Sequence, residues 1–531
     1  MRRFDLGSLA VHVYGGWEEI GGNQVLLEER DGALLLDFGR PFGRWGTYFT
    51  EFLSPRSTLG LRDLLYLRLL PPIPGLYRDE AEDTLFPSDL ERNLLRGEFP
   101  PGEKVLALLL SHAHLDHTGA VAYLRRDLPV VATAATAAIA KAMQDTAQVG
   151  LDGEAAYLSP RTLNGEGILE GDRKRYLRRP YRLLGRLQGF PDLSPAKTKG
   201  LEGDPWTGHD TPLEIGPFRV EAFPVDHSVP GATAFAVGTP AGLVVYTGDL
   251  RRHGRWRERT EAFLQALEGR EVFLLVAEGT RLGEARPART EEEVGEALHA
   301  EVARWEGCPV AVDFAPRNLE RLLSCLEVAE ALGRRLVVTP KDAYLLYGLA
   351  HAEPDPWKGV LERVLVLREA RGRTPGWEEH LWAQEGVHPT GMETIARDPG
   401  AYLLAFGFYE VNRLLDLRLL EAALGGKRRR GAYIFSNSYW ADQEQILDLG
   451  VLLAWLGRLD FHLLPEGLAD LPRDPAGVKN PFHTSGHAPE PDLLEAVRRL
   501  QPRYLLPVHT ERPERWRELL RREETEVLLP G

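Results

Sequence analysis

Residues 111–117, Ser-His-Ala-His-Leu-Asp-His, constrain this 531-residue chain more than any other stretch. Three imidazoles and one carboxylate fall within six positions, directly after the apolar run 105–110. A short apolar run that follows a Pro-Pro-Gly turn is typical of a buried strand. The strand would end at a loop whose side chains converge on a cation such as zinc, manganese or iron. A histidine-rich surface loop is the alternative, but a packed domain has little other use for this combination.

Further candidate ligands stand where other apolar runs end. The runs 218–225, 243–247 and 272–276 lead to Asp226-His227, Asp249 and Glu278, and the run 504–508 leads to His509. Strands that finish in polar residues at one edge of a sheet predict a shared site there. Seven residues can be gathered into a two-metal centre: His112, His114 and His227 around one ion, Asp116, His117 and His509 around the other, and Asp249 bridging.

Such a centre would suit phosphodiester hydrolysis. Two cations roughly 3.5–4 Å apart can share a hydroxide, and they clamp the attacking and leaving oxygens of an in-line displacement. Asp116 would then be catalytic as well as a ligand. His487 is the candidate general acid, oriented by Glu278. His483, with the Ser485-Gly486 backbone, could cradle a phosphate, or His483 could simply cap a turn.

The charge balance sets limits on the partner. A net charge of −14 argues against a general nucleic-acid coat, because phosphate binding requires basic surface. Six residues nevertheless form a basic and aromatic cluster: Arg173, Lys174, Arg175, Tyr176, Arg178 and Arg179. This cluster is either a solvated helix face or a patch that meets phosphates and stacks a base.

Segment patterns predict more than one domain, as the length requires. Residues 41–100 and 145–212 read as long loop insertions, whereas Thr290 opens a capping box and an alternation of helices and strands follows. That alternation predicts an α/β domain with a parallel sheet. Asp37, at the end of the apolar run 33–36, is either a cap or an acceptor that orients a metal-bound histidine.

Two bulk features bear on the compartment. Only two cysteines occur, Cys308 and Cys325, and they do not make a disulfide framework. The first residues lack the apolar stretch of a signal peptide, and no apolar run is long enough to span a membrane. We therefore expect a cytoplasmic protein without a membrane partner.

These motifs together resemble a known family. His112-x-His114-x-Asp116-His117, with Asp37, His227 and Asp249, is similar to the metallo-β-lactamase superfamily. Glu278-Gly279-Thr280, Ser485-Gly486-His487 and Pro507-Val508-His509 resemble the further motifs of its β-CASP nuclease branch. Within that branch the chain is most similar to RNase J, through residues 15–23, 507–509 and Asn318-Leu319-x-Arg321.

The resemblance implies a four-layer αββα domain with an inserted Rossmann-like β-CASP domain. The expected boundaries are 1–282 and 471–531 for the metallo-β-lactamase domain and 283–470 for the β-CASP domain. It also implies two divalent ions, zinc or alternatively manganese, and Asn318 and Arg321 as contacts to substrate phosphate. A histidine at position 509 is typical of members that process RNA, so RNA is favoured over DNA.

Several functions remain in competition. The leading one is a ribonuclease that hydrolyses single-stranded RNA, cutting from an end, internally, or both. A DNA nuclease of repair or defence is the alternative, followed by a small-molecule metallo-hydrolase and by a scaffold without activity. The oligomeric state stays open.

Overall fold

The structure is a computed structural model. It describes residues 1–50, 52–79, 101–147, 150–172, 175–197, 200–369, 372–426, 428–439, 443–470 and 479–529. The chain forms two compact units. Unit 1 comprises Met1–Arg252, Trp256–Pro287 and His487–Gly531, and unit 2 comprises His253–Arg255 and Ala288–Gly486. Unit 2 is therefore an insertion into the sequence of unit 1. None of the described helices is long and apolar enough to cross a membrane.

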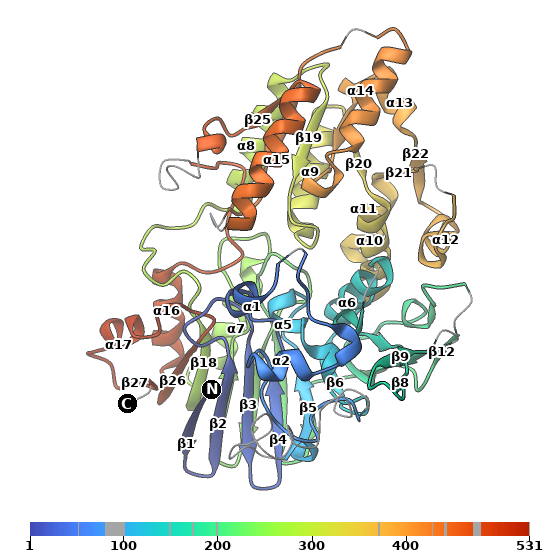
Figure 1. Ribbon diagram of the computed structural model, residues 1–531. Helices are drawn as coiled ribbons and strands as arrows, with labels where there is room; N and C mark the ends of the chain where they lie inside the picture. Colours follow the sequence, from blue (N-terminus) through green and yellow to red (C-terminus); the bar gives the residue numbers. More distant parts are fainter. Residues whose placement is uncertain are drawn as a thin grey trace. The chain divides into compact units, whose positions relative to one another are not determined.

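The first sheet of unit 1 has eight strands (Figure 1). Their order is β1 (Arg2–Leu6), β2 (Leu9–Gly15), β3 (Gln24–Glu29), β4 (Gly32–Leu36), β5 (Val105–Leu109), β6 (Val130–Thr133), β11 (Tyr181–Leu184) and β13 (Thr207–His209). Strands β1 to β4 pair in antiparallel fashion, and the strands from β4 to β13 pair in parallel. The parallel half brings the carboxyl ends of β4 and β5 to the same edge, where residues 37–40 and 111–117 follow.

The second sheet of unit 1 has seven strands. Their order is β14 (Leu213–Ile215), β15 (Phe218–Pro224), β16 (Thr233–Thr239), β17 (Gly242–Tyr246), β18 (Val272–Glu278), β26 (Tyr504–Val508) and β27 (Glu526–Val527). Strand β26, from the end of the chain, pairs in parallel with β18. This pairing places His509 one residue beyond the level of Glu278.

The two sheets pack face to face. One buried cluster takes side chains from both, including Val11 and Leu34 from the first sheet and Phe235 and Tyr246 from the second. A second cluster covers the outer face of the second sheet with α7 (Arg257–Leu267) and α16 (Glu490–Leu500). Helix α6 (Ala134–Thr146) packs against β6 and β11 of the first sheet. These layers make the αββα arrangement, so the predicted fold class is confirmed for unit 1.

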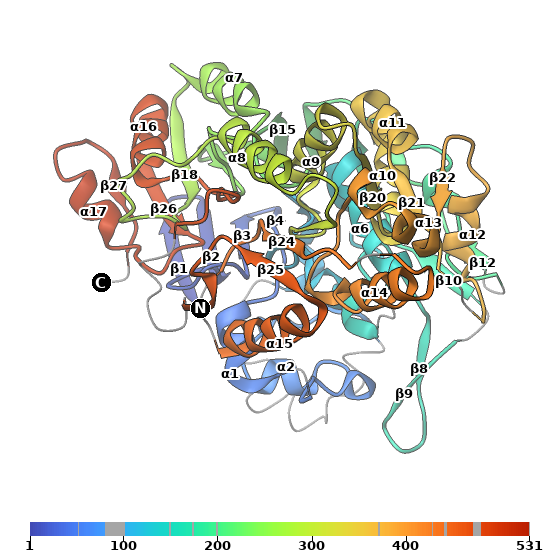
Figure 2. The ribbon, with the colours of Figure 1, turned by 90° about the horizontal axis from the view of Figure 1, so that it is seen from above.

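Unit 2 contains one parallel sheet of seven strands, as the sequence predicts. Its order is β22 (His388–Thr390), β21 (Leu365–Leu367), β20 (Arg335–Val338), β23 (Tyr402–Leu404), β19 (Val310–Asp313), β24 (Gly431–Phe435) and β25 (Phe461–Leu464). Figure 2 shows α8 (Glu291–Arg304), α9 (Leu319–Ala331), α10 (Pro340–Ala352) and α11 (Pro354–Arg363) on one face and α14 (Arg413–Ala423) and α15 (Gln443–Leu459) on the other. Helices α12 (Gly376–Trp382) and α13 (Met392–Arg397) complete the unit. The capping box predicted at Thr290 is confirmed.

The two expected insertions differ from simple loops. The described part of residues 41–100 contains two short helices, α1 (Phe42–Tyr48) and α2 (Arg62–Tyr66). The expectation of a loop is wrong for residues 145–212, which hold a three-stranded sheet of β7 (Tyr157–Leu158), β10 (Arg175–Arg178) and β12 (Gly200–Glu202) and a hairpin of β8 (Arg161–Leu163) and β9 (Leu169–Gly171). Strands β11 and β13 of the same segment extend the first sheet. Strands this short carry almost no alternating pattern, so the sequence does not reveal them.

Candidate metal centre

The loop that follows β5 carries the densest group of candidate ligands. It leads through His112 and His114 into α5 (Leu115–Thr118), a single helical turn. Backbone bonds from residues 38–40 hold this turn: the Phe38 amide donates to the His117 carbonyl at 3.0 Å, and the Arg40 amide donates to the Leu115 carbonyl at 3.0 Å. A Cβ at Gly39 would lie 1.6 Å from the Asp116 carbonyl oxygen, so this close approach requires glycine.

One group of four side chains has the spacing of a metal site. His112, His114, His227 and Asp249 each present a ligand atom, and these atoms lie within 4.8 Å of one another. His114 Nδ1 is 3.2 Å from His112 Nε2 and 3.1 Å from His227 Nε2. Zinc with bonds of about 2.0–2.1 Å in tetrahedral geometry would place its ligand atoms about 3.3–3.4 Å apart. The group therefore needs little rearrangement to hold such an ion.

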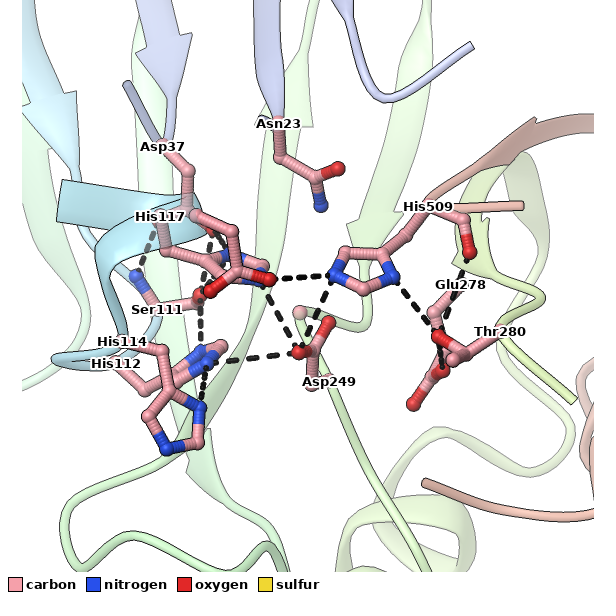
Figure 3. A network of polar contacts seen from close by, with 12 residues as sticks. Asn23, Asp37, Ser111, His112, His114, His117, Asp249, Glu278, Thr280 and His509 are labelled. Atoms are coloured by element: carbon pink, nitrogen blue, oxygen red, sulfur yellow. Dashed lines mark hydrogen bonds and ion pairs between the residues drawn. The ribbon is translucent and has the colours of Figure 1, made fainter. Parts of the chain in front are cut away.

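A second group shares Asp249 with the first and adds Asp116, His117 and His509 (Figure 3). Asp249 Oδ2 lies 3.1 Å from His117 Nε2, and Asp116 Oδ2 lies 3.0 Å from His509 Nε2. Among the described residues, Asp249 Oδ1 is buried without a hydrogen-bond partner, and Asp249 Oδ2 and His117 Nε2 meet each other without satisfying hydrogen-bond geometry. Buried polar atoms of this kind are costly unless a cation or another partner satisfies them. The nitrogen and carboxylate donors suit zinc or manganese.

Asp37 fixes the orientation of one imidazole. Its buried carboxylate accepts hydrogen bonds from the Ser111 amide at 2.7 Å, from the Ser111 hydroxyl at 2.6 Å and from the Tyr246 hydroxyl at 2.6 Å. It also lies 2.6 Å from His117 Nδ1, which leaves His117 Nε2 directed toward Asp249. Asp37 thus orients the His117 ring, while metal binding by that ring stays a prediction. Ser111 and Tyr246 were not singled out by sequence reasoning, because a lone hydroxyl gives no recognisable signal.

Thr280 connects two functional side chains and was likewise missed as a site residue. Its hydroxyl oxygen lies 2.8 Å from His509 Nδ1 and donates to Glu278 Oε2 at 2.8 Å. The contact with His509 leaves Nε2 of that ring directed toward Asp116. The only sequence signal was its place in Glu278-Gly279-Thr280, two residues after a strand-terminal acid.

His487 lies beside the cluster and is paired with Glu278. Its Nδ1 is 2.9 Å from Glu278 Oε2, while the Leu250 amide donates to Glu278 Oε1 at 2.7 Å. Burial lowers the pKa of His487, but the carboxylates of Glu278 and Asp249 outweigh it and raise the pKa to about 9. These carboxylates thus favour the protonated form of the His487 ring. Glu278 could also join a metal group with Asp249, His487 and His509, but its oxygens already accept these hydrogen bonds.

Two predicted phosphate contacts have other partners in the structure. The Arg321 guanidinium is completely buried and pairs with Glu291 through bonds of 2.6 and 2.9 Å. It also donates to the Phe482 carbonyl at 2.6 Å. The Asn318 side chain accepts from the Arg321 amide at 3.1 Å and caps α9. Both side chains therefore have partners within unit 2, and their contact with substrate phosphate stays a prediction.

The expected phosphate cradle lies at the end of unit 2. His483 and Ser485 are partly buried, and the Ser485 carbonyl lies 2.9 Å from His253 Nε2. With Gly486 they belong to unit 2, whereas the residues of both metal groups belong to unit 1. A contact of His483, Ser485 and Gly486 with phosphate stays a prediction.

The described part of the basic cluster is largely neutralised by neighbouring acidic residues. Arg173 and Lys174 lie outside the described residues. Residues 175–178 form strand β10, so the expected helix face is wrong. Arg175 pairs with Asp172 and Glu202, Arg178 pairs with Asp192, and the Tyr176 ring packs on Tyr157. Arg179 is completely buried and donates to the carbonyls of Leu124 and Arg125. These contacts argue against the expected nucleic-acid patch.

Comparisons with known proteins agree with this geometry. The pattern of the metallo-β-lactamase superfamily matches residues 83–262, and that of the Zn-dependent metallo-hydrolase RNA specificity domain matches residues 476–530. Ribonuclease J of Pyrococcus abyssi is 23% identical over 522 residues, which cover 96% of this chain and 91% of that protein. Ribonuclease J of Mycolicibacterium smegmatis is 25% identical over 350 residues, which cover 65% of this chain and 47% of that protein. The matched part thus spans about half the length of the mycobacterial relative.

A solved structure shares the fold over the whole chain. The crystal structure of a protein of unknown function from Enterococcus faecalis V583 aligns with a TM-score of 0.65 and 21% identity, covering 99% of this chain and 98% of that one. The matches and the His/Asp cluster together identify the chain as a distant homologue of ribonuclease J and a metallo-hydrolase of the metallo-β-lactamase superfamily with an RNA specificity domain.

Proposed function

We propose that the protein is a metal-dependent nuclease that hydrolyses phosphodiester bonds of single-stranded RNA. The observation that carries the proposal is the pair of overlapping ligand groups that share Asp249, next to a histidine held by Glu278. The match to an RNA specificity domain and the likeness to ribonuclease J favour RNA over DNA.

The two groups would hold two divalent ions, Zn²⁺ or Mn²⁺. His112, His114 and His227 would bind one, Asp116, His117 and His509 the other, and Asp249 both. Ions bound there would lower the pKa of a water molecule and neutralise charge that develops on phosphate oxygens. Asp37 and Thr280 would keep the His117 and His509 rings in their binding orientation.

The protein's own proton donor would be His487. Glu278 holds its Nδ1 at 2.9 Å, so Nε2 is the atom that would give a proton to the leaving oxygen. The carboxylates of Glu278 and Asp249 raise its pKa to about 9, which would favour a protonated ring at neutral pH. Glu278 would then stabilise the imidazolium rather than contact the substrate.

We further propose the domain assignment that follows from this function. Residues 1–282 and 471–531 would form the metallo-β-lactamase domain, and residues 283–470 the β-CASP domain. Two units divided at Pro287 and His487 support an insertion of this kind, with residues 479–486 grouped with the inserted unit rather than with the metallo-β-lactamase domain.

The test is cleavage of 5′-phosphorylated single-stranded RNA by purified protein with Zn²⁺ or Mn²⁺. We expect cleavage that the Asp116→Ala variant loses, and weaker activity on DNA of matched sequence. A strong preference for DNA would replace the proposal with a DNA nuclease. A circular RNA substrate separates internal cutting from cutting at an end.

A small-molecule hydrolase predicts a different result. If its substrate had a good leaving group, that group would depart without receiving a proton. The activity of such an enzyme would therefore survive His487→Ala. Loss of RNA cleavage in His487→Ala, with metal content retained, supports the nuclease.

A further inference from the structure

Exposed aromatic side chains are concentrated on one part of unit 1. Among the described residues, five aromatic side chains are exposed, and four of them lie between residues 42 and 66: Phe42, Tyr48, Phe52 and Tyr66. Phe52 is 92% exposed and Tyr66 is 75% exposed. A concentration of exposed apolar side chains marks an interaction site more often than chance. We refer to Phe42, Trp45, Tyr48, Phe52 and Tyr66 as the aromatic surface.

The aromatic surface does not serve the hydrophobic core. Helix α1, which carries three of its residues, has no buried residue. Arg44 ties α1 to its surroundings by donating to the Arg68 carbonyl at 2.9 Å and to the Glu19 carboxylate at 2.8 Å. The Arg40 guanidinium lies 4.2 Å from the centre of the Trp45 ring. Polar and cation–π contacts therefore hold the segment in place, and the rings of Phe42, Tyr48, Phe52 and Tyr66 are left to the solvent while Trp45 is partly covered.

The same segment is joined to the metal loop. The Arg40 amide bonds the carbonyl of Leu115, which lies between His114 and Asp116, and α1 begins two residues later. The Leu115 side chain is itself 38% exposed. Figures 1 and 2 both show α1 and α2 side by side. The aromatic surface thus begins at the rim of the candidate metal centre.

Residues 40–68 contain five arginines and two acidic residues, in a chain whose net charge is −14. Three of these arginines pair with carboxylates, namely Arg40 with Asp152, Arg44 with Glu19 and Arg56 with Asp63, so the exposed rings rather than the charge distinguish the segment. Another exposed apolar surface, on α14 and α15 of unit 2, is aliphatic instead and includes Leu419, Leu447 and Val451. Planar rings beside cations favour nucleobases, whereas an aliphatic helix face favours a protein partner.

We propose that the aromatic surface stacks bases of the single-stranded RNA that enters the metal centre; the inference rests on the proposed function. Every base presents a π face, so stacking on these rings would bind RNA without reading its sequence. The surface would position the strand so that a phosphodiester bond reaches Asp249 and its neighbouring ligands.

The test compares the triple variant Phe42→Ala, Tyr48→Ala, Phe52→Ala with the wild type in the full-length protein. Fluorescence anisotropy with a labelled single-stranded RNA should show affinity about tenfold weaker or more, because each lost stack costs measurable binding free energy. KM for RNA should rise, whereas hydrolysis of bis(p-nitrophenyl) phosphate should stay unchanged. Leu419→Ala, a matched loss of an exposed apolar side chain in unit 2, should bind RNA as the wild type does.

Two outcomes would overturn the stacking site. RNA affinity within about twofold of the wild type would show that the rings do not touch the substrate. A change of oligomeric state in light scattering, with RNA affinity retained, would show that the surface binds a second copy. A wild type that binds RNA through this surface without cutting it would support the stacking site and refute the nuclease.

Discussion

Replacing Thr280 by valine tests whether the ring of His509 is held for metal binding. Valine keeps the shape of threonine but removes the 2.8 Å contacts with His509 Nδ1 and Glu278 Oε2. A buried group that loses its partner costs about 1–3 kcal/mol, and outer-shell changes lower metal affinity by about 10–100-fold. We expect Thr280→Val to bind the ion at the group of Asp116, His117 and His509 about 10–100-fold more weakly.

The assay is competition for metal between the protein and a chromophoric chelator, which resolves a tight and a weak site. Only the site that includes His509 should weaken, because Thr280 does not contact His112, His114 or His227 in the described contacts. Thr280→Ser, which restores the hydroxyl, should bind both ions as the wild type does. Equal affinities in Thr280→Val and the wild type would refute the reasoning.

Four further predictions follow from the geometry. Asp37→Asn should lower metal content after dialysis, measured by mass spectrometry, because an amide is a poorer acceptor for an imidazole N–H; full retention would contradict this. Since the pKa of His487 is raised to about 9, cleavage should decline as the pH rises through 9, and Glu278→Gln should move that decline to lower pH. Burial raises the pKa of Asp313 to about 7, so the unfolded chain loses this proton first and the melting temperature should fall between about pH 4 and 7; Asp313→Asn should flatten that fall. Arg179→Ala should lower the melting temperature because the carbonyls of Leu124 and Arg125 lose their hydrogen-bond donor. A loss of RNA affinity with an unchanged melting temperature would instead support the expected nucleic-acid patch.

The candidate ligands could be found from sequence because each follows a strand. The carboxyl ends of β4 and β5 reach one edge of the first sheet, and those of β15, β17, β18 and β26 reach one edge of the second, so residues distant in sequence meet between the two sheets. The structure brings all seven side chains together. Their role as ligands stays a prediction that metal titration can test.

Other features depended on tertiary contacts that no local pattern encodes. Arg321 resembles a phosphate ligand in sequence. In the structure its guanidinium forms a buried ion pair with Glu291, which lies thirty positions earlier in the chain. Within residues 145–212, β11 is stabilised by pairing with β6 and β10 by pairing with β7 and β12, contacts that no alternating pattern in the sequence reveals. Thr280 contacts His509 and Ser111 contacts His112. Thr280 reaches His509 because the register of β18 with β26 places them at neighbouring levels, which the sequence alone does not show.

Strand β26 also sets a condition on when the protein becomes competent. His509 is delivered by the penultimate strand of the chain, which must insert beside β18 and bond the Gly16 carbonyl through the His509 amide. During synthesis the ligands up to Asp249 emerge first, and the second group stays without its last imidazole. A chain in which β26 has not yet paired with β18 would therefore hold six of the seven candidate ligands, and the second group would lack its last imidazole.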